Sequence, residues 1–359
     1  MGKILASNVL VLVTGASGYL GSHVVDQLVR SGHRVRGTVR SHKVAANKEA
    51  FSIYGDTVEI FGIDDLVHGM FPEAFTDVHA VIHTAAPLFG RAESKEAALT
   101  DAIEGSLNVF RQAEKAGVRQ FSYASSIAAV SMEFYNKRDF TPITEDQWPD
   151  TSREEILGDD DADTTAVYTA EKALSERALW EFADQHPHVE ITSLNPPFFY
   201  GPFAPGYKAY HGSGTISLAT LSTMVYCYGM IISKPHPFLL PHTYLIDVRD
   251  VARAMIIAAL DSPPTSQVGR KRILLTGEWP NPADVVNLIT KERPELASRI
   301  NEEFKTRPNV VKTIIDNTRA QQVLGLTPMP WQKTVLDALD ELIRIEEEWR
   351  KAGLVPENL

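Results

Sequence analysis

The sequence predicts an α/β fold, a doubly wound parallel sheet with a smaller C-terminal substrate lobe. In the first 195 residues, short runs rich in β-branched residues alternate with longer segments whose apolar residues recur every three or four positions. Such alternation is typical of a parallel sheet covered by helices on both faces. After residue 197, the alternation gives way to a stretch rich in aromatic residues, Gly, Pro and His, which indicates a separate lobe.

Six segments are predicted to be buried strands. They are residues 8–15, 34–40, 58–62, 80–87, 120–126 and 189–196. Between the fourth and the fifth, the spacing of Leu99, Ile103 and Leu107 is typical of a helix with one buried face. A further strand and helix within 244–263 are expected to rejoin the main sheet, and a long amphipathic helix is expected over 331–351.

These elements divide the chain into two predicted domains. Residues 1–197 plus 244–262 would form the nucleotide-binding domain, and residues 198–243 plus 263–359 the substrate-binding lobe. A chain of 359 residues is long enough for one large domain and a smaller lobe.

The composition excludes several classes of protein. A net charge of −11 disfavours nucleic-acid binding, because proteins that bind nucleic acids carry basic patches. No apolar run reaches the roughly 18 residues that a membrane-spanning helix needs. The start lacks a secretion signal, the single cysteine, Cys227, excludes an internal disulfide, and no N-glycosylation sequon occurs. We therefore expect a cytoplasmic protein.

A glycine-rich turn joins the first strand to the first helix in "VLVTGASGYLGSHVV". In the spacing G-x-x-G-x-x-G, the first glycine permits a tight turn and the second lets the backbone approach a pyrophosphate. The third lets the helix pack closely on the strand, with the phosphates at the helix N-terminus. The pattern therefore predicts a Rossmann-type dinucleotide site. Its predicted residues are Gly15, Ser17, Gly18, Tyr19, Leu20 and Gly21.

The end of the second strand indicates which dinucleotide binds. NAD enzymes usually have a carboxylate there, which binds the ribose hydroxyls. This chain has "VRSHK" instead, so that Arg40 and Lys43 are available for the 2′-phosphate of NADPH, although a solvated basic turn has the same composition. After the third strand, Asp64 or Asp65 is expected either to contact the adenine or to be the N-cap of a helix over 66–71.

Tyr168 and Lys172 lie four residues apart in the segment "YTAEKALSERALW", which is predicted to be helical. Residues at this spacing lie on the same helix face, one turn apart. A tyrosine has a pKa of about 10, and a neighbouring ammonium stabilises the phenolate and lowers that pKa. The pair is therefore a candidate general acid with its tuning charge, although Tyr-x-x-x-Lys also occurs by chance.

The chain resembles the extended short-chain dehydrogenases/reductases, also called the NAD-dependent epimerase/dehydratase superfamily, because a series of motifs follows the order of that family. They are "TGASGYLG", "VIHTAAP", "YASSIAAV", "YTAEK" and "NPPFFYGP", followed by "DVRDVARA" and "DNTRAQQVLGL". Within the family, the chain is most similar to the group of dihydroflavonol reductases, cinnamoyl-CoA reductases and fungal aldehyde or methylglyoxal reductases.

The resemblance implies a catalytic triad of Ser126, Tyr168 and Lys172. Ser126 would hydrogen-bond the substrate carbonyl oxygen, Tyr168 would protonate that oxygen as hydride arrives, and Lys172 would bind the nicotinamide ribose. Ser125 is the neighbouring alternative, and either serine could instead cap the next turn. The asparagine that the family often has before the fifth strand is missing from residues 100–105, which gives water a larger part in proton transfer.

The resemblance also implies cofactor contacts at the ends of the fourth and sixth strands. They are Thr84, Ala85, Ala86, Pro196 and Phe198, whereas His83 is expected to be structural. Aromatic and apolar residues in the following loops and in the second lobe are candidate walls of a substrate pocket. They are Phe89, Phe134, Tyr135, Phe203, Tyr207 and Met224. We expect no metal site, and the acidic segment 158–165 is interpreted as a solvated loop in which Asp163 or Thr164 caps the next helix.

The predicted function is an NADPH-dependent carbonyl reductase that acts on an apolar or aromatic aldehyde or ketone, as a monomer or homodimer. A sugar-nucleotide epimerase or dehydratase is disfavoured. Asn195, Phe198 and Thr243 stand where those relatives commonly have an arginine, an asparagine and a second arginine. A non-catalytic NADPH-binding sensor is disfavoured too, because such proteins tend to lose the tyrosine or the lysine. Neither a nucleic acid nor a membrane is an expected partner.

Overall fold

A parallel sheet of seven strands forms the centre of the computed structural model, which describes residues 8–86, 92–131, 142–207, 218–232, 244–309 and 312–354. The strands are β1 (Leu10–Thr14), β2 (Arg34–Val39), β3 (Val58–Gly62), β4 (Val78–His83), β5 (Gln120–Ala124), β6 (Glu190–Asn195) and β9 (Lys271–Leu274). Their order in the sheet is β3-β2-β1-β4-β5-β6-β9. The order reverses between β1 and β4, which is the place where doubly wound sheets bind ligands. The predicted α/β fold with a doubly wound parallel sheet is confirmed.

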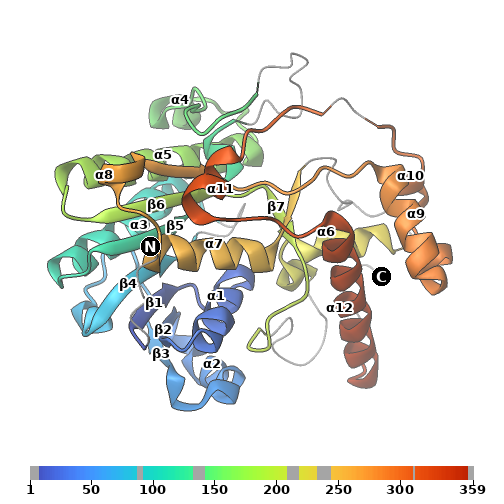
Figure 1. Cartoon of the computed structure of the whole chain (residues 1–359), viewed down its shortest axis with the longest axis horizontal. Helices are drawn as coiled ribbons and strands as arrows, with labels where there is room; N and C mark the ends of the chain where they lie inside the picture. Colours follow the sequence, from blue (N-terminus) through green and yellow to red (C-terminus); the bar gives the residue numbers. More distant parts are fainter. Residues whose placement is uncertain are drawn as a thin grey trace.

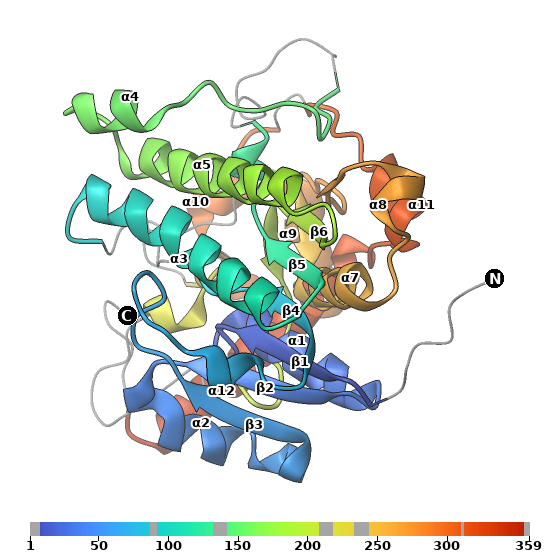
Figure 2. The same cartoon turned by 90° about the vertical axis from the view of Figure 1, so that its left-hand side faces the viewer.

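Helices cover both faces of the sheet (Figures 1 and 2). On one face α1 (Tyr19–Arg30) packs against α7 (Val248–Leu260), and on the other α3 (Lys95–Lys115) packs against α5 (Thr164–Gln185). Successive residues of β1 belong alternately to the two core clusters, because successive side chains of a strand point to opposite faces. Both faces of the strands are therefore apolar, as the runs of β-branched residues predicted.

The remaining helices are shorter, apart from the last. They are α2 (Val44–Ala50), α4 (Arg153–Gly158), α6 (Met224–Met230), α8 (Thr265–Val268), α9 (Pro282–Glu292), α10 (Glu302–Lys305), α11 (Thr318–Leu324) and α12 (Trp331–Lys351). Turns of 3-10 helix are η1 (Ser41–Lys43), η2 (Ser52–Thr57), η3 (Pro72–Phe75), η4 (Ile127–Ala129), η6 (Leu218–Leu221) and η7 (Pro294–Arg299). No helix within the described ranges is long and apolar enough to cross a membrane.

The strand within 244–263 was expected in the main sheet, and this expectation is wrong. That strand, β8 (Leu245–Asp247), pairs with β7 (Phe198–Tyr200) in a separate two-stranded sheet. Only the helix that follows it, α7, lies on the main sheet. The place beside β6 is taken instead by β9, whose four residues are all buried and which comes from the segment assigned to the substrate lobe. Apart from these strands, the predicted domain boundaries stay a prediction.

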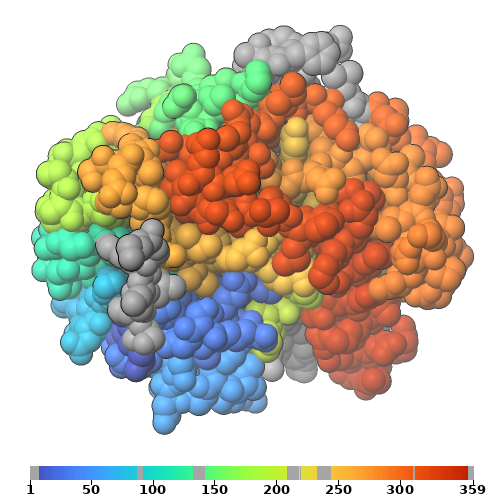
Figure 3. Space-filling model, viewed as in Figure 1, coloured from blue at the N-terminus to red at the C-terminus, as the bar shows by residue number. Residues whose placement is uncertain are grey.

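The C-terminal helix α12 begins and ends where the sequence predicted, at residues 331 and 351. It packs against α6, α9 and β8, and its buried face includes Val335, Leu342 and Ile345. Figure 3 shows dark red residues at the lower right of this face, other orange and red residues across its upper part, and blue residues at the lower left.

Candidate active site

The glycine-rich turn lies between the ends of β1 and β4, where the sheet order reverses. Gly15 has a φ of +67°, and a Cβ atom there would lie 2.9 Å from backbone atoms of Ala85. A Cβ atom at Gly21 would lie 2.2 Å from the carbonyl oxygen of Gly15, so only glycine lets α1 pack this closely on the turn. The steric roles predicted for the first and third glycines are confirmed.

The N-terminus of α1 offers backbone amides to an anion. Gly18 is the residue that precedes the helix, and no side chain caps it. The first intrahelical bond runs from the amide of Ser22 to the carbonyl of Gly18, so the amides of Tyr19, Leu20 and Gly21 have no acceptor within the helix. Three unpaired N–H groups and the positive end of the helix dipole suit a pyrophosphate.

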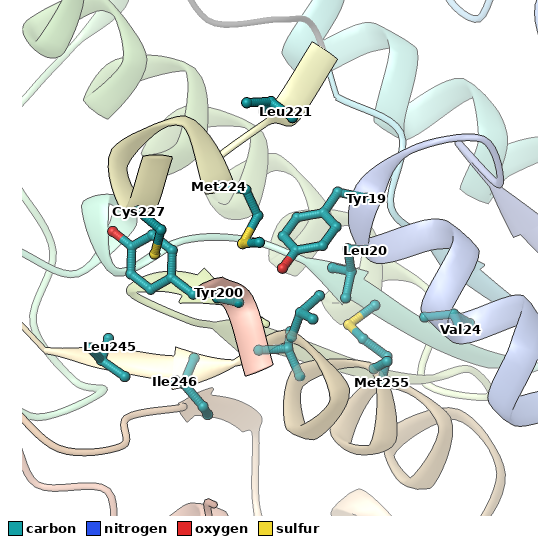
Figure 4. Packing of buried hydrophobic residues seen from close by; sticks show 14 of the residues in the cluster. Tyr19, Leu20, Val24, Tyr200, Leu221, Met224, Cys227, Leu245, Ile246 and Met255 are labelled. Atoms are coloured by element: carbon teal, nitrogen blue, oxygen red, sulfur yellow. The ribbon is translucent and has the colours of Figure 1, made fainter. Parts of the chain in front are cut away.

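The side chain of Tyr19, in contrast, belongs to the core rather than to a ligand site (Figure 4). It is 4% exposed, and its hydroxyl donates to the carbonyl oxygen of Gly201 at 2.6 Å. Burial raises the pKa of this phenol well above its usual value. Leu20 is also buried in the same cluster. Only the backbone of these two predicted cofactor residues is therefore available to a ligand.

Three of the predicted pocket residues, from the segment after β6, lie in or against this core as well. Met224 is fully buried beside Tyr19 (Figure 4). Phe203 and Tyr207 stack on each other at 4.6 Å between ring centroids, and both rings contact Tyr19. The assignment of Met224 to a pocket wall is wrong, because the helix that carries it turns this side chain inward. The other candidates, Phe89, Phe134 and Tyr135, lie outside the described residues.

The predicted phosphate-binding cations stand at the carboxyl end of β2. Arg40 and Lys43 are exposed, and no described carboxylate lies within ion-pair distance of either cation. Asp64 accepts a hydrogen bond from the amide of Ser41 at 2.8 Å and so fixes this loop. Hydrogen bonds from the side chain and then the amide of Ser41 lower the pKa of Asp64. Asp65 accepts hydrogen bonds from two amides of the turn after it, but the helix expected over 66–71 does not form: these residues make only a turn.

The end of β4 is tied to the end of β1. Thr84 Oγ1 donates to the carbonyl oxygen of Thr14 at 2.6 Å, which turns the chain away after β4 and places Ala85 against Gly15. Both ring nitrogens of the buried His83 have hydroxyl partners, on Thr14 and on Ser106. Burial lowers the pKa of His83 to about 3, so the ring is neutral. The structural role expected for His83 is confirmed.

The two candidate serines at the end of β5 have different partners. Ser125 Oγ donates to Glu176 Oε2 at 2.6 Å, deep in the protein. Ser126 Oγ accepts a hydrogen bond from the amide of Ala128 at 3.1 Å, as the capping alternative predicted, and keeps its own proton to donate. The geometry therefore favours Ser126 as the serine available to a substrate.

Tyr168 and Lys172 lie one turn apart on α5, which begins after Asp163 caps its N-terminus. The ammonium nitrogen of Lys172 is 5.9 Å from the centroid of the Tyr168 ring and 3.5 Å from the carbonyl oxygen of Ala124 at the end of β5. Helix α5 also packs against η4, the turn that directly follows Ser126. The structure thus brings all three predicted catalytic residues to the carboxyl end of β5.

The protonation of Lys172 is set by its neighbours. Burial by itself would lower the pKa of this amine. The nearby groups of Tyr168, Tyr123 and Glu171 outweigh burial and raise the pKa of Lys172 above its usual value. Lys172 therefore remains an ammonium ion at neutral pH, as a tuning charge must.

Sequence reasoning missed a buried polar network that holds α5 in place. Glu176, one turn beyond Lys172 on α5, is fully buried and accepts from Ser125, Ser193, Asn195, Trp180 and Arg272. The guanidinium of Arg272, on β9, is also buried and lies 3.5 Å from the centre of the Trp148 ring. The sequence did contain a signal for Glu176. It lies four residues after Lys172, as Lys172 lies four after Tyr168, so all three residues are on the same side of the helix.

Sequence reasoning also missed Glu171. Together with Lys172, it lines a small cavity that reaches the predicted cofactor residues Ala85 and Ala86. The remaining lining residues are Ala102, Ser106, Tyr123 and Ser175.

The other predicted positions are placed as follows. Pro196 is buried, and its carbonyl oxygen accepts from the amide of Ile127 in η4. Phe198 is half-buried on β7, and its ring meets Tyr226 edge-on. Ser17 is half-buried in the glycine-rich turn. The acidic segment 158–165 is mostly exposed, and the described residues contain no group of side chains that could hold a metal ion.

Comparisons with known proteins agree with this geometry. The profile of the NAD dependent epimerase/dehydratase family matches residues 11–271. NADPH-dependent methylglyoxal reductase GRE2 of Saccharomyces cerevisiae is 25% identical, over 94% of this chain and 98% of that protein. Cinnamoyl-CoA reductase 1 of Petunia hybrida is 28% identical, over 94% of this chain and 92% of that protein. The crystal structure of yeast methylglyoxal/isovaleraldehyde reductase Gre2 complexed with NADPH has a TM-score of 0.76 at 23% identity, over 94% of this chain and 99% of that one. These similarities confirm the predicted resemblance and the fold.

Proposed function

This chain belongs to the NAD dependent epimerase/dehydratase family, and we propose that it is an NADPH-dependent reductase of aldehydes or ketones in which Tyr168 is the general acid. One observation carries the proposal. Tyr168 and the ammonium of Lys172 share a face of α5, and Ser126 stands at the end of the strand to which Lys172 bonds. The site therefore contains a proton donor, a positive charge that lowers the pKa of that donor, and a hydroxyl that can bind a carbonyl oxygen. It lies beside the glycine-rich turn that is typical of dinucleotide-binding proteins.

The residues of the site fit NADPH. The uncapped amides of Tyr19, Leu20 and Gly21 would hold the pyrophosphate, and a side chain at Gly15 would collide with the β4 loop. Arg40 and Lys43 would hold the 2′-phosphate, since both cations are exposed and neither forms an ion pair with a described carboxylate. When bound, NADPH supplies the hydride that reduces the carbonyl carbon.

The chain's own residues supply the proton and stabilise the charge. Ser126 donates a hydrogen bond to the carbonyl oxygen, where negative charge develops. Tyr168 gives its phenolic proton to that oxygen, which completes the alcohol. Lys172, whose pKa is raised by its neighbours despite burial, is an ammonium ion when Tyr168 gives up its proton, and it stabilises the phenolate that forms.

An apolar or aromatic carbonyl compound is the proposed substrate. The support comes from Phe89, Phe134 and Tyr135, which follow the strands that end at the site. Among the relatives, cinnamoyl-CoA reductase 1 is named for a substrate with an aromatic group, whereas the methylglyoxal reductase is named for a small aldehyde and supports only the carbonyl class. The pocket assignment of Met224 no longer contributes, because this residue belongs to the core.

The decisive experiment follows NADPH absorbance with aliphatic, aryl and α-keto carbonyl compounds, in the wild type and in Tyr168→Phe. We expect turnover in the wild type and a loss of roughly 100-fold or more in kcat in the variant, with NADPH binding retained. Tyr54→Phe is the matched control, because it removes a hydroxyl that bonds Asp26 on α1, far from α5 in the chain.

Other outcomes would redirect the assignment. Turnover on sugar nucleotides alone would overturn the reductase and favour an epimerase. Binding of NADPH without turnover of any carbonyl compound would favour the sensor. A Tyr168→Phe variant with full activity would remove Tyr168 as the general acid.

A further inference from the structure

Glu171 is a buried carboxylic acid without a hydrogen-bond donor among the described residues. Its exposed fraction is 5%, and it directly precedes Lys172 on α5. Ser175 donates to the backbone carbonyl of Glu171, not to its carboxyl group. A carboxyl group that has no donor among the described residues keeps its capacity to bind a water molecule.

Glu171 lines a cavity together with Lys172. The cavity has a volume of about 10 Å³, which is room for about one water molecule. Its wall also includes Ser106, Ser175 and Tyr123, so a water there has several polar partners. Tyr123 and Ser175 are already hydrogen-bonded to each other at 2.8 Å, and Ser106 lies 3.3 Å from His83. Glu171 and Lys172 thus have the capacity left to bind the water.

The charges around Glu171 allow it to exchange a proton near neutral pH. Burial raises its pKa to about 7, with the ammonium of Lys172 opposing the rise and Asp101 adding to it. Asp101 is exposed on α3, the helix packed against α5. The other titratable groups around the cavity are Tyr168 and Glu176 on α5, Tyr123 on β5 and the neutral His83 on β4.

We propose that Glu171 passes protons from solvent to Lys172 through a water molecule in this cavity. The inference rests on the proposed function, because it restores the proton that Tyr168 gives to the product. Ala102 also lines the cavity, and its short side chain leaves the space that the water occupies.

The proton balance of one turnover is closed. Tyr168 loses its O–H proton to the product oxygen and becomes a phenolate. The Lys172 ammonium beside its ring returns a proton to the phenolate and becomes an amine. The cavity water protonates that amine and takes a proton from the carboxylic acid of Glu171. The resulting carboxylate recovers a proton from solvent, so one solvent proton enters for each alcohol formed.

The test compares Glu171→Gln with the wild type over about pH 5.5 to 9, with saturating NADPH and carbonyl substrate. We expect kcat to fall roughly tenfold or more, and the wild-type decline of kcat above about pH 7 to disappear. Glu181→Gln, at an exposed position of the same helix, should behave as the wild type. An unchanged kcat and pH profile in Glu171→Gln would overturn the proposal.

Two further variants separate proton relay from a structural role. Ala102→Val fills the cavity while Glu171 stays in place, and it should lower kcat with the KM for NADPH unchanged. In Glu171→Ala, added formate should restore part of kcat, because a small acid can occupy the vacated space. If formate restores none of kcat and Ala102→Val has the wild-type kcat, the proton relay is contradicted. Carboxyl infrared bands of the cofactor-free protein should show one group titrating near pH 7 that Glu171→Gln lacks.

The Tyr168→Phe result keeps the two proposals apart. If that variant is inactive while Glu171→Gln keeps the wild-type kcat and pH profile, the reductase stands and the relay fails. If Tyr168→Phe keeps full activity, the general-acid assignment itself fails.

Discussion

Arg272 Nε donates to Glu176 Oε1 at 2.9 Å, a buried ion pair between residues 96 positions apart in the sequence. It joins the edge strand β9 to the helix that carries Tyr168 and Lys172. The guanidinium also donates to the carbonyl oxygens of Gln147 and Ala129, which lie on either side of the undescribed segment 132–141. The pair therefore holds three parts of the chain around the candidate site.

We predict that Glu176→Gln destabilises the protein by about 3 to 5 kcal/mol, because the Arg272 charge would remain buried without its counter-ion. Denaturant unfolding measures the loss. Glu181→Gln, on the exposed side of α5, should change the free energy of unfolding by less than about 0.5 kcal/mol. Equal losses of unfolding free energy in the two variants would mean that the buried ion pair contributes no more to stability than an exposed side chain does.

The two neighbouring serines should respond to alanine in opposite ways. Ser126→Ala should lower kcat/KM roughly 100-fold, since the donor to the carbonyl oxygen is lost, with about 1 kcal/mol of stability lost from the η4 cap. Ser125→Ala should leave kcat near the wild type and cost about 1 to 3 kcal/mol, because Glu176 loses a buried donor. Steady-state kinetics and thermal unfolding of both variants check this. The reverse pattern would assign the substrate contact to Ser125.

Arg40→Ala should change the preference between the two nicotinamide cofactors. A charge-assisted hydrogen bond to phosphate is worth about 1.5 to 3 kcal/mol, so the Kd of NADPH should rise roughly 10- to 100-fold. The Kd of NADH should stay almost constant, because NADH has no 2′-phosphate. Fluorescence titration with both cofactors measures this, and Arg34→Ala, at the other end of β2, is the matched control. A parallel rise for both cofactors would contradict the assigned contact.

Glu171 should make stability depend on pH in a direction that its pKa fixes. The pKa of this acid is raised to about 7 in the folded protein, above its usual value, so the folded state holds the proton more tightly. The stabilisation is complete below the unfolded pKa of about 4.3 and is lost as pH rises through about 7. Relative to Glu171→Gln, the wild type should therefore lose about 2 kcal/mol between these limits, allowing for screening. Unfolding curves of both proteins at several pH values measure the difference, and parallel pH dependence would refute it.

Local patterns in the sequence determined the parallel sheet, the glycine-rich turn and the Tyr168–Lys172 face. Each depends on residues close together in the chain, where the periods of strand and helix and the steric needs of glycine dictate the outcome. Ser126 was chosen over Ser125 by resemblance, and the separate hydrogen bonds of the two hydroxyls now supply a physical reason.

Tertiary structure alone decided where distant segments meet. β9 rather than β8 extends the main sheet, and Met224 belongs to the core rather than to a pocket, because burial depends on which elements pack against a residue. Arg272 and Glu176, or Glu171 and the cavity beside Ala102, show no shared pattern in the sequence. Their pairing arises only when α3, α5 and β9 come together, and low solvent access there makes each buried charge matter.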